Sequence, residues 1–301
     1  MRLAKVLGAI GRVCVTAGVL ILLFVAYQLW GTGIREAQAQ NRLSDQFEEK
    51  LGRPLDDSTS TTGPGTSTTT STPAPPPPPA GDGDAVAHIR IPKIGVDKIV
   101  VQGVGVPDLK KGPGHYPTSP LPGQPGNAAI AGHRTTYGAP FNRIDELEAG
   151  DEILITTLQG SFRYEVRQQL IVKPDQVEIL KDFGDDRLTL TSCNPKYSAR
   201  QRIVVVSALQ GPAAPASPRP PGAGEGESAA APTLDAGLGG ERASAWPAIF
   251  LGVACALIWV AAWLLGKLWS KWPAYAVGLP IFLVVLFFFF ENFSRLLPAN
   301  F

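Results

Sequence analysis

Cysteine, histidine and charge are all scarce in this chain of 301 residues. It has three cysteines and three histidines, and the cysteines are too few and too scattered for a disulfide scaffold or a four-cysteine zinc site. Charged residues make up 18% of the chain, and 27 Lys and Arg against 26 Asp and Glu leave a net charge of +1. Because a nucleic-acid-binding protein needs a concentrated positive surface, this balance argues against that class of protein.

Three apolar runs predict transmembrane helices. The first covers residues 13–30 without a charge, and as a helix it is long enough to cross a hydrocarbon core of ~30 Å. A cleaved signal peptide is the alternative for this run, since Ala37-Gln38-Ala39 fits a cleavage site, but the apolar region of a signal peptide would be shorter. The other two runs are residues 245–265 and 274–290.

Positive charges beside the apolar runs predict how the chain crosses the membrane. Three basic residues and no acidic one precede the first run: Arg2, Lys5 and Arg12. Residues 1–12 are therefore expected in the cytoplasm, together with the 266–273 connection and its two lysines. Everything from about residue 31 to 244 then lies outside the cell, and residues 291–301 form a C-terminal tail.

Low-complexity stretches flank a central segment of the chain. Residues 31–55 carry apolar side chains at a helical spacing, which predicts an amphipathic stem helix: Leu43, Phe47 and Leu51. Residues 56–85 are rich in Ser, Thr and Pro, and residues 211–244 are rich in Pro, Gly and Ala. Such stretches cannot bury enough apolar surface to fold, so both are expected to be linkers that tether the central segment.

The central segment, residues 86–210, is long enough to form one folded core. Runs rich in Val, Ile, Leu and Thr, separated by Gly, Pro, Asn and Asp clusters, predict these strands: 89–91, 98–104, 128–133, 152–157, 161–172, 187–193 and 202–209. Helical turns are expected only at 144–147 and 176–180. The pattern favours a mainly β fold, a closed β-barrel of about eight strands with short helices, over a β-sandwich.

Cys193 is the one cysteine of this central segment, because Cys14 and Cys255 lie in the apolar runs. It ends the predicted strand that begins at Arg187, and Asn194-Pro195 breaks the strand directly afterwards. A strand end directs a side chain toward a rim or a cleft, which suits a nucleophile. The alternative is a cysteine that is simply buried in the core.

A cysteine nucleophile needs partners, because at its ordinary pKa of ~8.5 only a few per cent of a thiol is ionised at pH 7. His133 also ends a predicted strand, and we favour it as the base over His88 and His115. Arg202 opens the strand after Cys193 and is the candidate for stabilising an oxyanion. Two other arginines are alternatives for this role: Arg187 and Arg200.

Three motifs together resemble the sortases, the cysteine transpeptidases of Gram-positive cell surfaces. They are Ala129-Ile130-Ala131-Gly132-His133, Thr189-Leu190-Thr191-Ser192-Cys193 and Arg202-Ile203-Val204-Val205, and the resemblance covers residues 86–210. It implies that Cys193 is the nucleophile that forms an acyl-thioester. It further implies that His133 is the proton donor and acceptor, and that Arg202 stabilises the oxyanion.

The loop Gly112-Pro113-Gly114-His115-Tyr116 and the Cys-Asn-Pro sequence are most similar to class E, the actinobacterial housekeeping sortases. In that class a tyrosine here lines the pocket for the second residue of the sorting signal, which implies that Tyr116 favours Leu-Ala-x-Thr-Gly over Leu-Pro-x-Thr-Gly. Thr191 and Ser192, next to the nucleophile, are also expected to bind substrate. The C-terminal pair of apolar runs departs from the single N-terminal anchor of most sortases.

The resemblance implies a multi-pass membrane enzyme whose catalytic domain is extracytoplasmic and which needs no metal or organic cofactor. Its expected partners are secreted proteins with a C-terminal sorting signal and an amine of a lipid-linked cell-wall peptide. Two alternatives stay open: a cysteine endopeptidase, in which water resolves the acyl-enzyme, and a non-catalytic anchored β-domain that binds a partner. The sequence also leaves open a sortase that polymerises pilins through a lysine.

Overall fold

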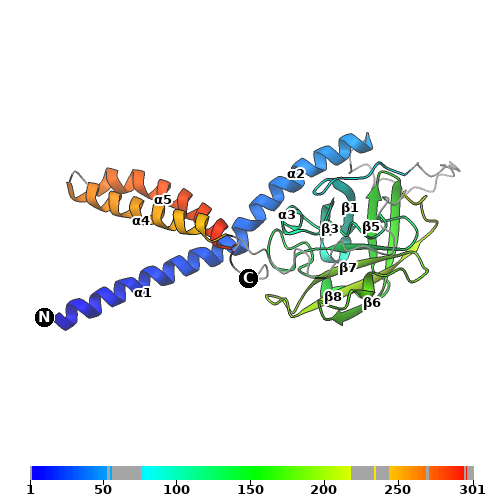
Figure 1. Ribbon diagram of the computed structural model, residues 1–301, viewed down its shortest axis with the longest axis horizontal. Coiled ribbons are helices and arrows are strands. Elements are labelled where there is room, and N and C mark those ends of the chain that lie inside the picture. Colours follow the sequence, from blue (N-terminus) through cyan, green and yellow to red (C-terminus); the bar gives the residue numbers. More distant parts are fainter. Residues whose placement is uncertain are drawn as a thin grey trace. The chain divides into compact units, whose positions relative to one another are not determined.

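The computed structural model describes residues 2–52, 55, 76–217, 234, 244–268, 271–294 and 296 (Figure 1). The chain divides into two compact units, one that gathers Met1–Thr32 with Gly240–Ala299 and one that holds Gly33–Gly239. Most of the predicted linkers, 56–85 and 211–244, lies outside the described residues.

The first unit is helical. It contains helix α1 (Arg2–Ala26), a π-helical turn (Tyr27–Gly31), and helices α4 (Trp246–Leu268) and α5 (Lys271–Ser294), of which the last two pack against each other (Figure 1). Among the described residues, two helices are long and apolar enough to cross a membrane, Trp246–Leu268 and Trp272–Ser294. The apolar part of α1, Ile10–Ala26, is shorter than these two helices.

The second unit is built on a closed barrel with the strand order β1-β2-β3-β4-β7-β8-β6-β5. The strands are β1 (Ala85–Ile91), β2 (Val96–Gln102), β3 (Gly114–His115), β4 (Asn127–Ala131), β5 (Glu152–Thr157), β6 (Gly160–Val172), β7 (Arg187–Asn194) and β8 (Gln201–Gln210). The prediction of a closed, mainly β barrel of about eight strands is confirmed, and the β-sandwich alternative is wrong.

Short helices connect the strands. The 3-10 turns Ile144–Glu146 and Val177–Leu180 lie where helical turns were expected, whereas α3 (Val106–Leu109) and the 3-10 turn Pro92–Ile94 were not predicted. Strand β3 was not among the predicted strands, because two residues in a Gly- and Pro-rich loop carry no strand pattern. It nevertheless closes the barrel, since it pairs in parallel with β2 and antiparallel with β4.

The barrel interior is filled by apolar side chains from most of the strands, among them Ile89, Ile130, Ile153, Leu190 and Val205. Every residue of β4 is buried, and so are the six central residues of β7. Strands that are buried on both faces have nearly continuous apolar sequences, which is why these two strands were easy to predict from the sequence. Other parts of the chain must therefore cover the outer face of β4 and β7, and the candidate active site lies under that cover.

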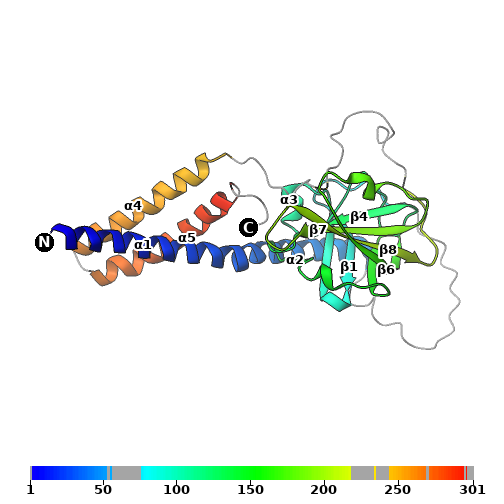
Figure 2. The same ribbon diagram turned by 90° about the horizontal axis from the view of Figure 1, so that it is seen from below.

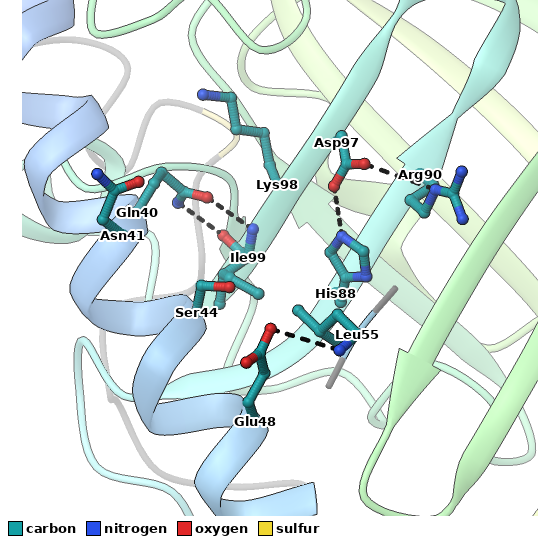
Figure 3. Close-up of a pocket in the computed structure, with 10 residues that line it drawn as sticks. All are labelled: Gln40, Asn41, Ser44, Glu48, Leu55, His88, Arg90, Asp97, Lys98 and Ile99. Atoms are coloured by element: carbon teal, nitrogen blue, oxygen red, sulfur yellow. Dashed lines mark hydrogen bonds and ion pairs between the residues drawn. The ribbon is translucent and has the colours of Figure 1, made fainter. Parts of the chain in front are cut away.

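Helix α2 (Thr32–Leu51) lies against the outside of the barrel along β2 (Figure 3). Leu43 and Phe47 are buried there with Val101. The Gln40 side chain accepts a hydrogen bond from the Ile99 amide (2.7 Å) and donates one to the Ile99 carbonyl (3.0 Å). Because β3 pairs only with Val101 and Gln102, the Ile99 main chain lies beyond it, and Gln40 satisfies that main chain instead.

Candidate active site

Strand register pairs two of the three predicted catalytic residues and places the strand that leads to the third beside them. Strand β7 lies between β4 and β8 (Figure 2). Cys193 on β7 pairs directly with Arg202 on β8. On the other side Thr191 pairs with Ala131 of β4, and the Gly132 amide donates to the Thr191 carbonyl (3.0 Å). His133 follows Ala131 by the same two positions by which Cys193 follows Thr191, so the chain reaches His133 directly after the strand that pairs with β7.

The Cys193 thiol lies in an apolar cluster that is distinct from the barrel core. The side chain is 2% exposed and is buried together with Leu109, Tyr116, Ala131 and Leu234. Four partly buried residues pack against the same cluster: Val172, Val177, Ile179 and Leu180. The cysteine is thus buried, but under a cover on the outer face of β4 and β7 and not inside the barrel.

His133 is buried, and its imidazole has no hydrogen-bond partner among the described residues. Burial, and secondarily the charge of Lys110, lowers the pKa of His133 to about 4. Within the described part of the chain neither ring nitrogen has a hydrogen-bond partner, and the Tyr137 ring lies 5.1 Å away between centroids. An imidazole without fixed partners can take and give a proton during a reaction.

The other two histidines are held by polar contacts. The Nε2 atom of His88 lies 2.5 Å from a carboxylate oxygen of Asp97, in a polar pocket between α2 and the strands β1 and β2 (Figure 3). The His115 ring lies 2.9 Å from the Gln102 side-chain oxygen on one side and 2.9 Å from the Pro120 carbonyl on the other. These contacts fit structural roles, which leaves His133 as the candidate base.

Arg202 is fully buried, and its guanidinium is directed at carbonyl oxygens. Its Nη1 donates to the carbonyls of Ala199 and Gln201, both at 2.9 Å, and its Nε donates to the carbonyl of Leu234 at 3.1 Å. A guanidinium that already binds a carbonyl beside the thiol is suited to binding the oxyanion that forms there. The two alternative arginines lie elsewhere, since Arg187 pairs with Asp185 (2.6 Å) and Arg200 is exposed.

The three predicted substrate-binding residues are all fully buried. The Tyr116 hydroxyl lies 3.3 Å from the Thr191 hydroxyl, beside the thiol cluster. Ser192 alternates to the other face of β7, where its hydroxyl donates to the Gly132 carbonyl (2.8 Å). Ser192 thereby fixes the segment that carries the candidate base, and the substrate contacts of all three residues stay predictions.

One residue of the site had no sequence signal of its own. Arg134 is 4% exposed, and its Nη1 donates to the Cys193 carbonyl (3.1 Å) and to the Asn194 side-chain oxygen (2.7 Å). Its Nη2 forms an ion pair with Asp145 at 2.8 Å. Arg134 therefore stabilises the end of β7 through hydrogen bonds to its last two residues. The chain has many arginines, and only the fold shows that this one contacts the nucleophile's main chain.

Gly132 precedes His133 because no side chain fits at that position. A Cβ atom there would lie 2.6 Å from the Phe141 ring, which is buried in the barrel core. The Phe141 amide donates to the His133 carbonyl (3.1 Å), so the loop after β4 folds back closely on itself. Glycine at position 132 therefore allows the Phe141 ring to pack against the main chain directly before His133.

The family model described as Sortase domain matches residues 89–210. Residues 89–210 are therefore a sortase domain. Sortases are cysteine transpeptidases, and the matched residues contain Cys193, His133 and Arg202.

The sortase domain has relatives in several bacteria. Sortase SrtE1 of Streptomyces coelicolor is 32% identical over 65% of this chain and 55% of its own length, and Sortase D of Bacillus subtilis is 37% identical over 36% and 53%. The chain thus spans about half the length of these two curated relatives. The solved structure of sortase E from Streptomyces avermitilis is 35% identical, with a TM-score of 0.40, over 44% of this chain and 91% of that one. Relatives of the E type agree with the class E resemblance.

Proposed function

We propose that this chain is a membrane-anchored transpeptidase that cleaves a Thr-Gly bond in a C-terminal sorting signal and transfers the acyl group to a cell-wall peptide amine. The observation that supports it best is the strand register, which pairs Cys193 with Arg202 and, on the other side of β7, pairs Thr191 with Ala131, two residues before His133. A buried thiol, an imidazole without hydrogen-bond partners among the described residues and a carbonyl-binding guanidinium are the parts that acyl transfer needs.

The first half of the reaction forms an acyl-enzyme. The Cys193 sulfur bonds to the threonine carbonyl carbon while the thiol proton passes to His133. Arg202 donates hydrogen bonds to the resulting oxyanion. When the intermediate collapses, the carbon–nitrogen bond to glycine breaks, and the His133 imidazolium gives its proton to the leaving amine.

The second half transfers the acyl group. An acceptor amine attacks the thioester carbon, its proton passes to His133, and the Cys193 thiolate leaves and regains a proton. Because the pKa of His133 is lowered to about 4, the imidazole is neutral at pH 7 and enters the cycle as a base. The charged thiolate–imidazolium pair then forms only as the substrate is attacked.

The proposed signal is of the Leu-Ala-x-Thr-Gly or Leu-Pro-x-Thr-Gly type. Tyr116 and Thr191 share the buried cluster region with the thiol and would contact the residues before the scissile bond. The acceptor would be a lipid-linked cell-wall peptide, because such a molecule and a substrate with a hydrophobic tail would both lie at the membrane surface.

The chain would cross the membrane more than once, with residues 1–12 in the cytoplasm and the sortase domain outside. The two long apolar helices of the C-terminal region and the basic residues before α1 support this arrangement. Protease added to intact cells should digest the barrel and spare the 266–273 connection. Protection of the barrel in that experiment would contradict the arrangement.

Mass spectrometry of the full chain, kept in detergent and incubated with a Leu-Ala-x-Thr-Gly peptide, tests the reaction. We expect a thioester adduct on Cys193, its discharge onto an added amine, and no adduct with Cys193→Ala. Discharge at the same rate and to the same product with or without the amine would indicate an endopeptidase instead. If no adduct forms at Cys193 with either signal peptide, the proposal is wrong.

A further inference from the structure

A residue of the predicted linker lies in the proposed active site. Leu234 belongs to the 211–244 stretch, whose composition predicts no folded structure, yet its side chain is 0% exposed. It is buried in the same apolar cluster as Cys193 and Tyr116. Its carbonyl oxygen accepts a hydrogen bond from the Arg202 Nε at 3.1 Å.

These two contacts are the ones that a peptide substrate would need. An acyl donor must pack against the cluster that holds the thiol and present a main-chain carbonyl to the residue that stabilises the oxyanion. Leu234 does both, since it fills the cluster and occupies the Arg202 donor.

We infer that the linker docks into the substrate cleft through Leu234 and competes there with the sorting signal. The nature of the displaced peptide rests on the proposed function, whereas the occupancy of the cleft rests only on the contacts of Leu234. The binding site is thus the face formed by β4, β7 and Arg202, and its resident ligand is a segment of the same chain.

The linker sequence fits a competitor that is not cleaved. In the proposed signals the carbonyl that faces the oxyanion donor belongs to a Thr-Gly bond. In the linker the carbonyl that Arg202 binds belongs to Leu234, and Asp235 follows it in the chain. Cys193 would therefore face a Leu-Asp bond and no Thr-Gly bond at this position, and the proposed specificity would spare the linker.

The chain connection allows docking and makes it efficient. After β8 the chain packs on the barrel, where the Ala214 amide donates to the Gly123 carbonyl (2.7 Å) and Gln124 donates to the Ser217 hydroxyl (2.6 Å). The residues between Ser217 and Leu234 could span roughly 50 Å when extended, which is ample for a barrel of this size. A tethered ligand has an effective concentration of about a millimolar, so even weak docking would keep the cleft filled.

The access of reagents to Cys193 tests docking without any need for turnover. In the full chain in detergent, Leu234→Ala should speed alkylation of Cys193 by iodoacetamide by roughly tenfold, because the truncated side chain loses most of its apolar burial. Alkylation is quantified on the peptide that contains Cys193, since Cys14 and Cys255 can react with iodoacetamide as well. The matched control is Leu238→Ala, which removes a leucine from the same linker and should leave the rate unchanged.

A peptide added in trans checks that the effect is competition for the cleft. A synthetic peptide with the sequence of residues 230–238 should slow alkylation of the Leu234→Ala chain again, and the same peptide with alanine in place of its first leucine should not. In transfer assays, Leu234→Ala should lower KM for the signal peptide roughly tenfold and leave kcat unchanged, as expected when a competitor is removed.

The outcomes separate this inference from the proposed function. Faster alkylation with protection by the peptide, but no acyl transfer, would support docking and defeat the proposed activity. Unchanged alkylation of Cys193 in Leu234→Ala would overturn the inference even if transfer is observed. Equal acceleration by Leu238→Ala would overturn it as well, because the effect would then not depend on the residue that lies in the cleft.

Discussion

Two buried imidazoles should make the stability of this protein strongly dependent on pH. His115 and His133 are fully buried, and burial lowers the pKa of each from 6.5 to about 4. The unfolded chain takes up a proton on each below pH 6.5, whereas the folded chain does so only below about 4. Below pH 6.5 the unfolded state therefore binds more protons than the folded state. The contribution of the two histidines to the free energy of unfolding is largest above pH 6.5 and decreases as the pH drops toward 4.

The size of the effect follows from the two pKa values. A tenfold change in proton affinity is worth about 1.4 kcal/mol, so a pKa that moves from 6.5 to about 4 is worth about 3 kcal/mol for each histidine. The chain has only three histidines, so carbon-13 labelling of histidine in the full chain gives three ring signals that can be followed in a pH titration. His115→Asn and His133→Asn assign two of them.

We expect the His115 and His133 signals to titrate near pH 4. In chemical unfolding followed by circular dichroism, His115→Asn should lose about 3 kcal/mol less stability than the wild type between pH 7 and pH 4. Comparing the two chains cancels the opposite contribution of Glu36, whose pKa burial raises. A His133 signal that titrates near 6.5, or equal losses in the two chains, would refute the burial argument.

Three further substitutions test the supports of the site. Arg134→Gln removes the charged donor from the Cys193 carbonyl and should lower kcat at least tenfold with little change in KM, which Arg134→Lys should partly restore in steady-state assays. Gly132→Ala places a Cβ 2.6 Å from the Phe141 ring and should lower the free energy of unfolding by about 1–3 kcal/mol in chemical unfolding. Gln40→Ala leaves buried main-chain groups of β2 unpaired and should cost about 2 kcal/mol in the same experiment without changing kcat.

Much of the barrel could be predicted because most of its strands have a recognisable local sequence pattern. The β-branched runs of β7 and β8 stand between Gly-, Pro- and Asn-containing turns, and both were expected within a residue or two of their observed bounds. Strand β3 could not be predicted, since its two residues form a strand only because β2 and β4 lie on either side of them.

The sequence could nominate the candidate catalytic residues, because each stands at the end of a predicted strand within a recognisable motif, and their roles stay predictions. What the sequence could not show is their environment. The lowered pKa of His133 comes from burial, and Arg134 is distinguished from other arginines only by its contact with a main chain 59 residues away. The burial of Leu234 could not be predicted from the sequence either, because a single leucine in a Pro- and Gly-rich stretch forms no periodic pattern.

The sequence by itself determined which segments are apolar enough for a membrane, which become strands, and which thiol, imidazole and guanidinium are candidates for chemistry. These properties depend on neighbours within a few residues. Only the tertiary structure decided that β7 lies between β4 and β8, that the thiol is covered, and that the cover includes Leu234 from beyond the barrel. Such pairings join residues far apart in the chain, and their energy comes from burial that exists only after the barrel has closed.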